Sequence, residues 1–472
     1  MGAPAARAAE LARHWAAAGH EVSVLTGFPN HPTGVVPEEW RPRLRRLIYH
    51  EVISQTGRRL GLPETLAGLG VGPQGLKPTS TAALNGTAEA VPFPKPVYET
   101  SSKTPNFRLR PRTSEVQGPR SGVSFDVFRT WLWPLPNRKA HERMRIYASF
   151  FLSAALRGLT LPRPDVIIAT SPQLLVGLAG WWLASVRQIP FVFEVRDLWP
   201  ESLAAVGIGN EDSWLHRILG ALAGFLYERA DRIVVVTPAF REHLIERWRV
   251  PAEKIAVVEN GVETDLFAPL PQADRDRARH ELGAEGKFLV CYAGTMGMAH
   301  GLETLLDAAS QLQQQNPDVR FLLVGEGAEK ERIKALAQSR ALTNIRFLDQ
   351  QPRERIPAIL SASDACLVLL KKTDVFKTVI PTKMLEFMSS ARPVILAVEG
   401  QARQIVEEAG AGVVVEPENA AALERAIVQL ATNPALGTAL GQNGREYIVQ
   451  NLSRRQTAEK YGKVLKDLVG KS

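Results

Sequence analysis

The segment from Val375 to Val394, VFKTVIPTKMLEFMSSARPV, carries a lysine and a carboxylate at helical spacing. Its Pro-Thr-Lys turn precedes an apolar stretch that predicts a helix, and the strand VILAV follows. Lys383 and Glu386 lie three residues apart, so a helix places them on one face near its N-terminus. Free backbone N–H groups and the positive end of the helix dipole favour phosphate there. A cation for a diphosphate beside an acceptor for a ribose hydroxyl suits a nucleotide-linked substrate.

The same two residues also have a simpler explanation. An acid in a first helical turn is favourable by itself, and a lysine there is commonly solvated. The rest of the chain has to decide between these interpretations.

The composition favours a globular protein with anionic partners. The 472 residues are enough for two domains, and the hydrophobic fraction of 45% is ordinary. A net charge of +8 suits nucleotide sugars or acidic lipid surfaces. Nucleic acid is the least favoured partner, because aromatic and basic residues do not alternate. Cys291 and Cys366 lie in apolar runs and predict core thiols of a reducing compartment, with neither a disulfide framework nor metal-ligand spacing.

The elements that position these residues alternate between strand and helix. Short apolar strands such as PDVIIAT, IPFVFEV and RIVVVT are separated by helical stretches, and a second series begins at KFLVCYAG. This alternation predicts an α/β fold with doubly wound parallel sheets. Residues 55–122 are rich in Gly, Pro, Ser and Thr, and we expect a disordered insert within a hairpin. No apolar run reaches the roughly 18–20 residues that span a bilayer, and no secretory signal is recognisable.

Taken together, these motifs resemble the family-4 retaining glycosyltransferases of GT-B fold, from Gly2 to about Tyr461 apart from the insert. In that family the second Glu of a Glu-x7-Glu segment holds the donor ribose, and Glu386 matches it, whereas Thr378 stands in place of the first Glu. The Pro-Thr-Lys variant is similar to the fucosaminyl- and colanic-acid-type subgroup of bacterial surface polysaccharide synthesis. The resemblance implies that Lys383 neutralises part of the phosphate charge, beside Thr382.

Glycine turns after two strands of the second series fit a donor site. Gly325 and Gly327 form a Gly-x-Gly turn, which without a third glycine is a weak dinucleotide fingerprint, and a plain turn is the alternative. Gly294 and Thr295 follow KFLVCYAG. The resemblance implies that Thr295 and His300 occupy the places of two pyrophosphate-binding cations, and His300 could donate to phosphate when protonated.

Two further lysines are candidates for the same charge. Lys371 and Lys372 follow a strand end, where ligands gather in open α/β sheets. A solvated loop is the alternative for both.

The acceptor side is expected at the end of the strand PFVFEV. Charges in the segment Glu194 to Ser202 are costly to bury and sensible at a ligand site. Arg196 stays protonated and could stabilise phosphate or acceptor charge, while Asp197 or Glu194 orients or deprotonates the acceptor hydroxyl. An Arg–Asp ion pair that fixes a loop is the alternative. The resemblance also implies that Gly2 and Arg7 line the acceptor side.

A basic surface is expected near the first strands. Such a surface could rest on anionic lipid or simply be solvated. It comprises the helix expected at 138–158 and Arg41, Arg43, Arg45 and Arg46.

The resemblance also implies the domain layout. We expect an N-terminal acceptor-side domain over 1–265 that lacks its first strand, a nucleotide-sugar domain over 266–453, and a C-terminal helix over 454–472 that returns to the first domain. The predicted protein is cytoplasmic, possibly peripheral at the inner face of the membrane.

The expected reaction moves a sugar from a UDP or GDP donor to a glycan or polyprenyl-linked acceptor with retention, in polysaccharide or lipopolysaccharide synthesis. No metal or other cofactor is expected, since no DxD-type motif stands at a plausible strand end. One alternative is a catalytically impaired partner subunit, favoured by the absent first strand, Thr378 and the missing cation pair. An NAD-dependent oxidoreductase or an epimerase is the other, but the chain lacks a full G-x-G-x-x-G with an acid about 20 residues on.

Overall fold

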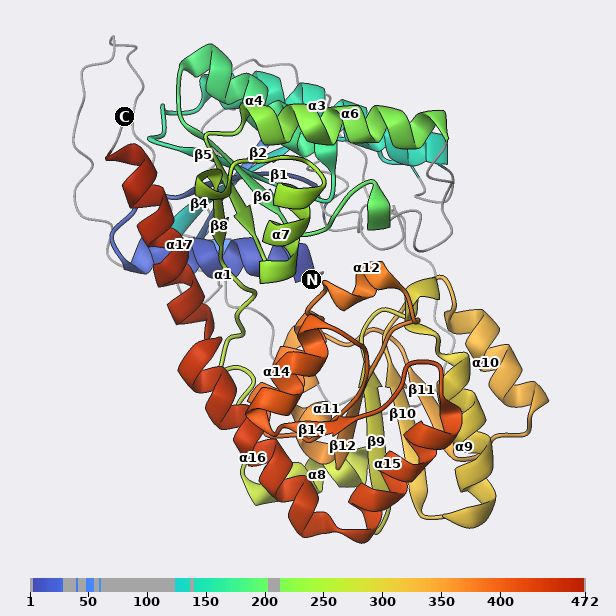
Figure 1. Cartoon of the computed structure of the whole chain (residues 1–472). Coiled ribbons are helices and arrows are strands. Elements are labelled where there is room, and N and C mark those ends of the chain that lie inside the picture. The colour runs from blue at the N-terminus through green and yellow to red at the C-terminus, as the bar shows by residue number, and fades with distance from the viewer. Residues whose placement is uncertain are drawn as a thin grey trace, which may run out of the picture.

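The computed structural model describes residues 3–28, 40, 48–54, 59–60, 124–135, 140–202 and 213–470. Gly2, the arginines at 41–46 and nearly all of the expected insert at 55–122 lie outside these ranges. The described chain forms two α/β halves, with the N-terminal half above the C-terminal half in Figure 1. None of the helices in these ranges is both long and apolar enough to cross a bilayer.

The C-terminal half is built on a six-stranded, all-parallel sheet in the order β11-β10-β9-β12-β13-β14. Apolar side chains alternate between two buried clusters, as expected for strands covered on both faces. The predicted doubly wound sheet is therefore confirmed for this half. The strands are β9 (Phe288–Ala293), β10 (Val319–Val324), β11 (Ile345–Leu348), β12 (Ala365–Leu369), β13 (Val394–Ala397) and β14 (Gly412–Val414).

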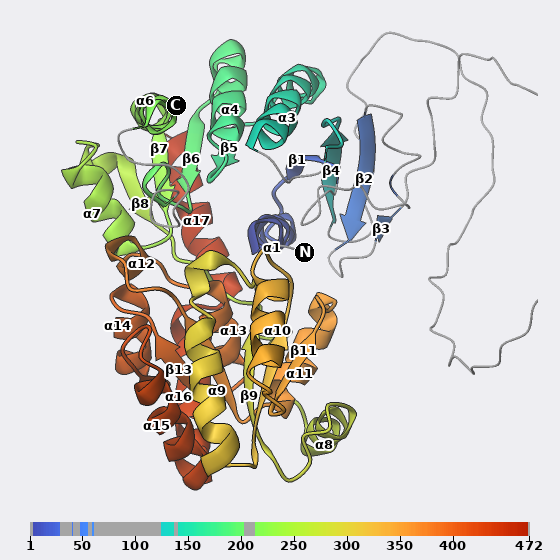
Figure 2. The same ribbon diagram turned by 90° about the vertical axis from the view of Figure 1, so that its right-hand side faces the viewer.

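Helices cover both faces of this sheet (Figure 2). They are α8 (Gln272–Glu281), α9 (Glu303–Gln315), α10 (Lys330–Ser339), α11 (Ile356–Ala362), α12 (Asp374–Lys377), α13 (Thr382–Ser389), α14 (Gln401–Ala409), α15 (Ala420–Thr432) and α16 (Pro434–Asn451). Two short 3-10 turns, η3 (Met298–His300) and η4 (Arg353–Arg355), follow β9 and β11.

The strands of the N-terminal half fall into two four-stranded sheets, β1-β4-β2-β3 and β5-β6-β7-β8. Figure 2 shows the two sheets apart, and within the described ranges no strand pairs with both β1 and β5. The predicted hairpin is confirmed, since β2 and β4 pair antiparallel in a single register. The strands are β1 (Ser23–Gly27), β2 (Ile48–Ser54), β3 (Arg59–Leu60), β4 (Ser124–Thr130), β5 (Ile167–Thr170), β6 (Phe191–Val195), β7 (Arg232–Val235) and β8 (Ile255–Val257).

Five helices of the N-terminal half are described. In both views α3, α4 and α6 lie side by side as an outer layer (Figures 1 and 2). Helices α4 and α6 pack on the sheet that contains β5 to β8, whereas α3 contacts β1 and β4. The helices are α1 (Ala3–Ala17), α3 (Ala140–Thr160), α4 (Leu174–Arg187), α6 (Trp214–Arg229) and α7 (Pro238–Glu246).

The last helix, α17 (Arg454–Val469), packs on the N-terminal half although it ends the chain. The Trp15 indole of α1 donates to the Ala458 carbonyl at 3.0 Å, and its ring meets that of Tyr461 edge-on at 5.3 Å. The chain thus passes between the halves twice. The two passages lie side by side, because the Val262 N–H donates to Leu452 O at 3.0 Å and the Arg454 N–H donates to Val262 O at 2.8 Å.

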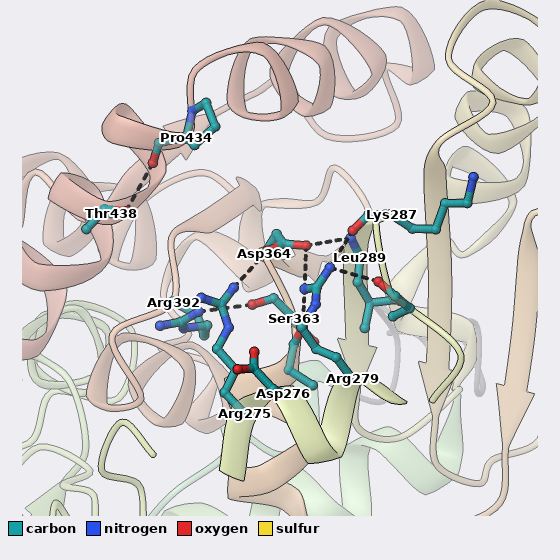
Figure 3. A network of polar contacts seen from close by, with 12 residues as sticks. Arg275, Asp276, Arg279, Lys287, Leu289, Ser363, Asp364, Arg392, Pro434 and Thr438 are labelled. Carbon is teal, nitrogen blue, oxygen red and sulfur yellow. Dashed lines mark hydrogen bonds and ion pairs between the residues drawn. The ribbon is translucent and has the colours of Figure 1, made fainter. Parts of the chain in front are cut away.

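A polar network fixes α8 to the start of β12 (Figure 3). The Asp364 carboxylate accepts from Arg275 and Arg279, each at 2.9 Å, and from the Leu289 backbone N–H at 2.8 Å. Arg392 donates to the Ser363 carbonyl at 3.1 Å beside it. One carboxylate therefore pairs with two guanidinium groups and joins a helix to two strands.

Candidate functional site

The glycine turns after β9 and β10 lie against each other, backbone to backbone. Gly325 has a φ of +142°, and a Cβ there would lie 2.0 Å from the Gly294 carbonyl oxygen. A Cβ on Gly327 would lie 2.2 Å from the Met296 carbonyl oxygen. The Gly294 N–H donates to Val324 O at 2.9 Å across this junction. The glycines are thus required for the packing of the two loops, independently of any ligand.

Lys383 lies over these loops without a counter-ion. Its Nζ donates to the Tyr292 hydroxyl at 2.9 Å and stands 4.2 Å from the centroid of that ring. A Cβ on Gly294 would lie 3.1 Å from Nζ. Among the described residues, no carboxylate forms an ion pair with Lys383, and burial lowers the pKa of its amino group to about 7. A desolvated amino group without a paired anion, beside a glycine that has no side chain, is suited to binding phosphate.

Helix α13 begins at Thr382 and places Glu386 one turn after Lys383, as predicted. Pro381 precedes it, and no side chain caps its first amides. Burial raises the pKa of Glu386 to about 7, although Arg353, with Nη1 3.7 Å away, opposes that rise. A half-buried carboxylate and a half-buried ammonium therefore share one end of α13.

Two predicted phosphate-binding cations are not supported by the structure. His300 lies with Nδ1 3.1 Å from the Leu369 carbonyl oxygen, and burial together with Lys383 lowers its pKa to about 3. The imidazole is therefore neutral and supplies no positive charge. Lys372 is exposed and pairs with Glu416 at 2.7 Å, so its charge is already neutralised.

The other two candidates near this site are exposed to solvent. Lys371 anchors the loop through its backbone N–H, which donates to Ala299 O at 2.9 Å. Thr295 contributes through its carbonyl, which accepts from the Tyr292 hydroxyl at 2.6 Å.

The prediction that Arg7 lines the acceptor side is wrong. Its side chain is buried, and its guanidinium donates to the Glu194 carboxylate at 3.0 Å and to Asn260 Oδ1 at 3.1 Å. It also donates to the Val258 carbonyl at 3.3 Å. Arg7 is thus a crosslink between α1, the end of β6 and the loop after β8.

Glu194 is the partner in that crosslink and not a base. Burial acts to raise the pKa of Glu194, but Arg7, Arg196 and hydrogen bonds outweigh it and leave the pKa lowered. An ionised carboxylate held by a buried guanidinium has little tendency to accept a proton.

Arg196 and Asp197 remain acceptor-side candidates. Ser171 Oγ accepts from both of their backbone N–H groups, at 2.8 and 3.3 Å, and Ser202 Oγ donates to Asp197 Oδ1 at 2.6 Å. Burial raises the pKa of Asp197 despite these bonds. Arg196 Nε is buried with no hydrogen-bond partner among the described residues. A fixed carboxylate thus adjoins a guanidinium with an unused donor.

Two contacts between the halves could not be found from sequence. Glu10 of α1 accepts from Arg353 Nη2 at 2.5 Å and from Arg454 Nε at 2.7 Å. Thr237 at the start of α7 donates to the Thr378 carbonyl at 3.0 Å. These partners are 141 to 444 residues apart, so no local spacing signals them. Thr378, which stands where the resemblance expects the first Glu, therefore contacts the N-terminal half through its carbonyl.

Comparison with known proteins decides the family. The model of glycosyl transferases group 1 matches residues 274–447, and that of a glycosyl transferase 4-like domain matches residues 107–261. The chain is a family-4 glycosyltransferase of GT-B fold. With both matched families consisting of glycosyltransferases, the oxidoreductase and epimerase alternatives have no support.

Similar proteins agree with this assignment. The glycosyltransferase is 26% identical over 330 residues to the probable glycosyltransferase WbjE of Pseudomonas aeruginosa, covering 70% of this chain and 80% of WbjE. It is 25% identical to the putative colanic acid biosynthesis glycosyl transferase WcaI of Escherichia coli, covering 63% and 73%. Its fold matches that of Anabaena HepE, solved in complex with UDP and glucose, with a TM-score of 0.56, 19% identity and coverage of 70% and 84%.

Proposed function

We propose that this glycosyltransferase moves a sugar from a nucleoside-diphosphate donor to a glycan or polyprenyl-linked acceptor, with retention, in cell-surface polysaccharide synthesis. The observation that carries the proposal is Lys383, a desolvated amino group without a counter-ion over the Gly294 turn, with Glu386 one helical turn further on. The name of WcaI refers to colanic acid biosynthesis, and HepE is titled as a complex with UDP and glucose. Both support the substrate class.

The donor is proposed to bind along the start of α13. Its diphosphate lies between Lys383 Nζ and the uncapped amides of the first turn, while the ionised Glu386 accepts hydrogen bonds from the ribose hydroxyls. Gly294 has no side chain to obstruct the approach to Nζ. This arrangement makes Lys383 the main side-chain cation at the diphosphate, since His300 is neutral and Lys372 is paired.

In the transfer step, the bond between the anomeric carbon and the diphosphate oxygen breaks, and a bond from the acceptor oxygen forms on the same face. The acceptor proton passes to the departing diphosphate, which keeps the bonding electron pair. Lys383 and the α13 N-terminus stabilise the charge that develops on that diphosphate. Arg196 and Asp197 are proposed to orient the acceptor hydroxyl. We propose that no metal is needed, because these groups supply the positive charge.

A lipid-linked acceptor requires access to a membrane, and the N-terminal half has a suitable surface. On α3, Leu152, Leu156 and Leu159 form a stripe at helical spacing, and Leu156 is 67% exposed. An exposed arginine accompanies them. We call this set the apolar face: Trp133, Met144, Leu152, Leu156 and Leu159 on and before α3, with Arg145 among them.

We propose that the apolar face rests on an anionic membrane, because the exposed Arg145 lies on the same helix as the exposed leucines and the chain carries a net charge of +8. Cosedimentation tests this. The wild-type protein is expected to bind vesicles with phosphatidylglycerol and to bind neutral vesicles weakly, and Leu152→Asp with Leu156→Asp is expected to abolish binding. A monodisperse dimer that dissociates in the double variant, without vesicle binding, would assign the face to a second copy instead.

The experiment that tests the function is a transfer assay preceded by donor titration. UDP-glucose and GDP-mannose are titrated into wild-type protein and Lys383→Met, and transfer to a polyprenyl-phosphate-linked acceptor is then measured with the sugar that binds. Donor binding and transfer, both lost in Lys383→Met, are the expected result. Binding without transfer to any acceptor would favour the impaired partner subunit, which the docked Thr378 also favours. Absence of binding by every nucleotide sugar would refute the proposal.

A further inference from the structure

A buried carboxylate of the N-terminal half is bound by two guanidinium groups from elsewhere in the chain. Glu10 of α1 is 2% exposed and accepts from Arg353 Nη2 at 2.5 Å and from Arg454 Nε at 2.7 Å. Arg353 belongs to η4 of the C-terminal half, and Arg454 begins α17. Glu10 is therefore a point at which three separate parts of the chain meet.

Arg353 reaches beyond Glu10 to the proposed donor site. Its Nη1 lies 3.7 Å from the Glu386 carboxylate, and its guanidinium carbon lies 5.2 Å from the centroid of the Phe267 ring. A planar guanidinium presents its nitrogens in a fixed fork, so the direction of one bond constrains the other. The contact with Phe267 further restricts the plane. One rigid group thus links Glu10 in the N-terminal half with Glu386 in the C-terminal half.

Among the described residues, Arg353 is the cation within ion-pair distance of the Glu386 carboxylate. The carboxylate is faced by Arg353 from η4, Glu10 from α1, Arg454 from α17 and Lys383 from its own helix. Arg454 is bonded to Glu10 at 2.7 Å, whereas Arg353 lies between the two carboxylates, 2.5 Å from Glu10 and 3.7 Å from Glu386. Without Arg353, Glu386 would face the like charge of Glu10.

We propose that Arg353 is a positioning residue for donor binding: it favours the ionised form of the Glu386 carboxylate and directs it at the ribose, and its bond to Glu10 makes donor affinity depend on the N-terminal half. This inference rests on the proposed function, since it takes Glu386 as the ribose acceptor. It adds that the donor site, although built from the C-terminal half, is completed by a residue of α1.

The proposal predicts opposite effects from the two ends of the link. Loss of Arg353 removes a positive neighbour, so Glu386 holds its proton to higher pH. The loss of donor affinity on acidification therefore begins at a higher pH than in the wild type. Glu10→Gln removes a negative neighbour, so the loss of donor affinity on acidification begins at a lower pH than in the wild type. A general loss of structure would weaken binding in both variants without moving their profiles in opposite directions.

The test is calorimetric titration of UDP-glucose between about pH 5.5 and pH 8.5. The variants are Arg353→Ala, Arg353→Lys and Glu10→Gln, and Arg355→Ala is the matched control, since Arg355 lies on the same turn and bonds Glu281 on the surface. Arg353→Ala is expected to weaken binding about fivefold at neutral pH, the effect of raising a pKa of about 7 by about one unit. Arg353→Lys is expected to restore part of the loss, and Arg355→Ala to match the wild type. Thermal unfolding of each variant shows whether it is folded.

Three results would overturn the proposal. Wild-type affinity and profile in Arg353→Ala would show that Arg353 does not position Glu386. A normal profile in Glu10→Gln beside a shifted one in Arg353→Ala would remove the dependence on the N-terminal half. If Arg353→Ala does not fold, the test rests on Arg353→Lys and Glu10→Gln. A change in the same direction, in both variants, of the pH at which donor affinity is lost would contradict the link between Glu10 and Glu386. Failure of nucleotide sugars to bind the wild-type protein at any pH refutes the proposed function itself.

Discussion

Donor affinity should have a maximum near neutral pH, because two groups with opposite requirements titrate there. Lys383 has to be protonated to attract the diphosphate, and its pKa in the free protein is about 7. Glu386 has to be ionised to accept the ribose hydroxyls, and its pKa is also about 7. Affinity is therefore lost above pH 7 through Lys383 and below pH 7 through Glu386.

The size of the effect follows from these two values. At pH 7 about half of each group is in the form that binds, so affinity there is about fourfold below that of the fully competent site. The first pH unit in either direction costs about threefold, and each unit beyond it approaches a cost of about tenfold, or about 1.4 kcal/mol. The alkaline side flattens above the pKa that Lys383 has in the complex, since bound phosphate stabilises its proton.

The assay is calorimetric titration of UDP-glucose over the same pH range. A nucleotide sugar is the better probe, because its diphosphate is esterified at both ends and lacks the terminal phosphate that titrates near pH 6. In Lys383→Met, donor affinity should no longer fall as the pH rises above 7. In Glu386→Gln, donor affinity should no longer fall as the pH drops below 7. Both variants should bind the donor more weakly than the wild type. Lys334→Met, an exposed lysine of α10, is the matched control and should retain both sides. A flat wild-type profile, or both sides persisting in the two variants, would refute the assignment.

Other perturbations separate stability from function. Asp364→Ala leaves Arg275 and Arg279 without their carboxylate and should lower the free energy of unfolding by about 3 kcal/mol in urea, with donor affinity unchanged. Glu194→Gln should destabilise by a similar amount, since it leaves buried Arg7 unpaired; an equal stability with lost activity would restore Glu194 as a base. Gly325→Ala should reduce both the melting temperature and nucleotide binding, because its Cβ would meet a carbonyl oxygen at 2.0 Å. Turnover should be unaffected by a chelator, and restoration by Mg²⁺ after chelation would contradict the metal-independent proposal.

The features that sequence predicted well are local in the chain. The apolar strands of the C-terminal half, the start of α13 and the shared face of Lys383 and Glu386 all depend on residues a few positions apart. The hairpin of β2 and β4 was predictable despite the long segment between them, because the resemblance to the family implies that the two strands are joined by a turn.

The features that sequence missed depend on distant partners or on burial. Arg7 resembles an acceptor-side residue, but its partners Glu194 and Asn260 lie 187 and 253 positions away and enclose it. His300 follows a suitable turn, yet its charge is decided by burial and by Lys383, 83 positions later. Glu10 is an ordinary helical acid in the sequence, and only the fold brings Arg353 and Arg454 to it.

The two passages of the chain between the halves limit how the protein can change shape. Because the strand-like bridge at Val262 and Ser453 holds both passages together, the halves cannot separate there without breaking backbone hydrogen bonds. A Cβ on Gly261 would also lie 2.6 Å from Thr457 Oγ1, so this position is closely packed. The bridge therefore opposes separation of the halves at this point, and a proteolytic cut in one passage would leave the halves joined by the other.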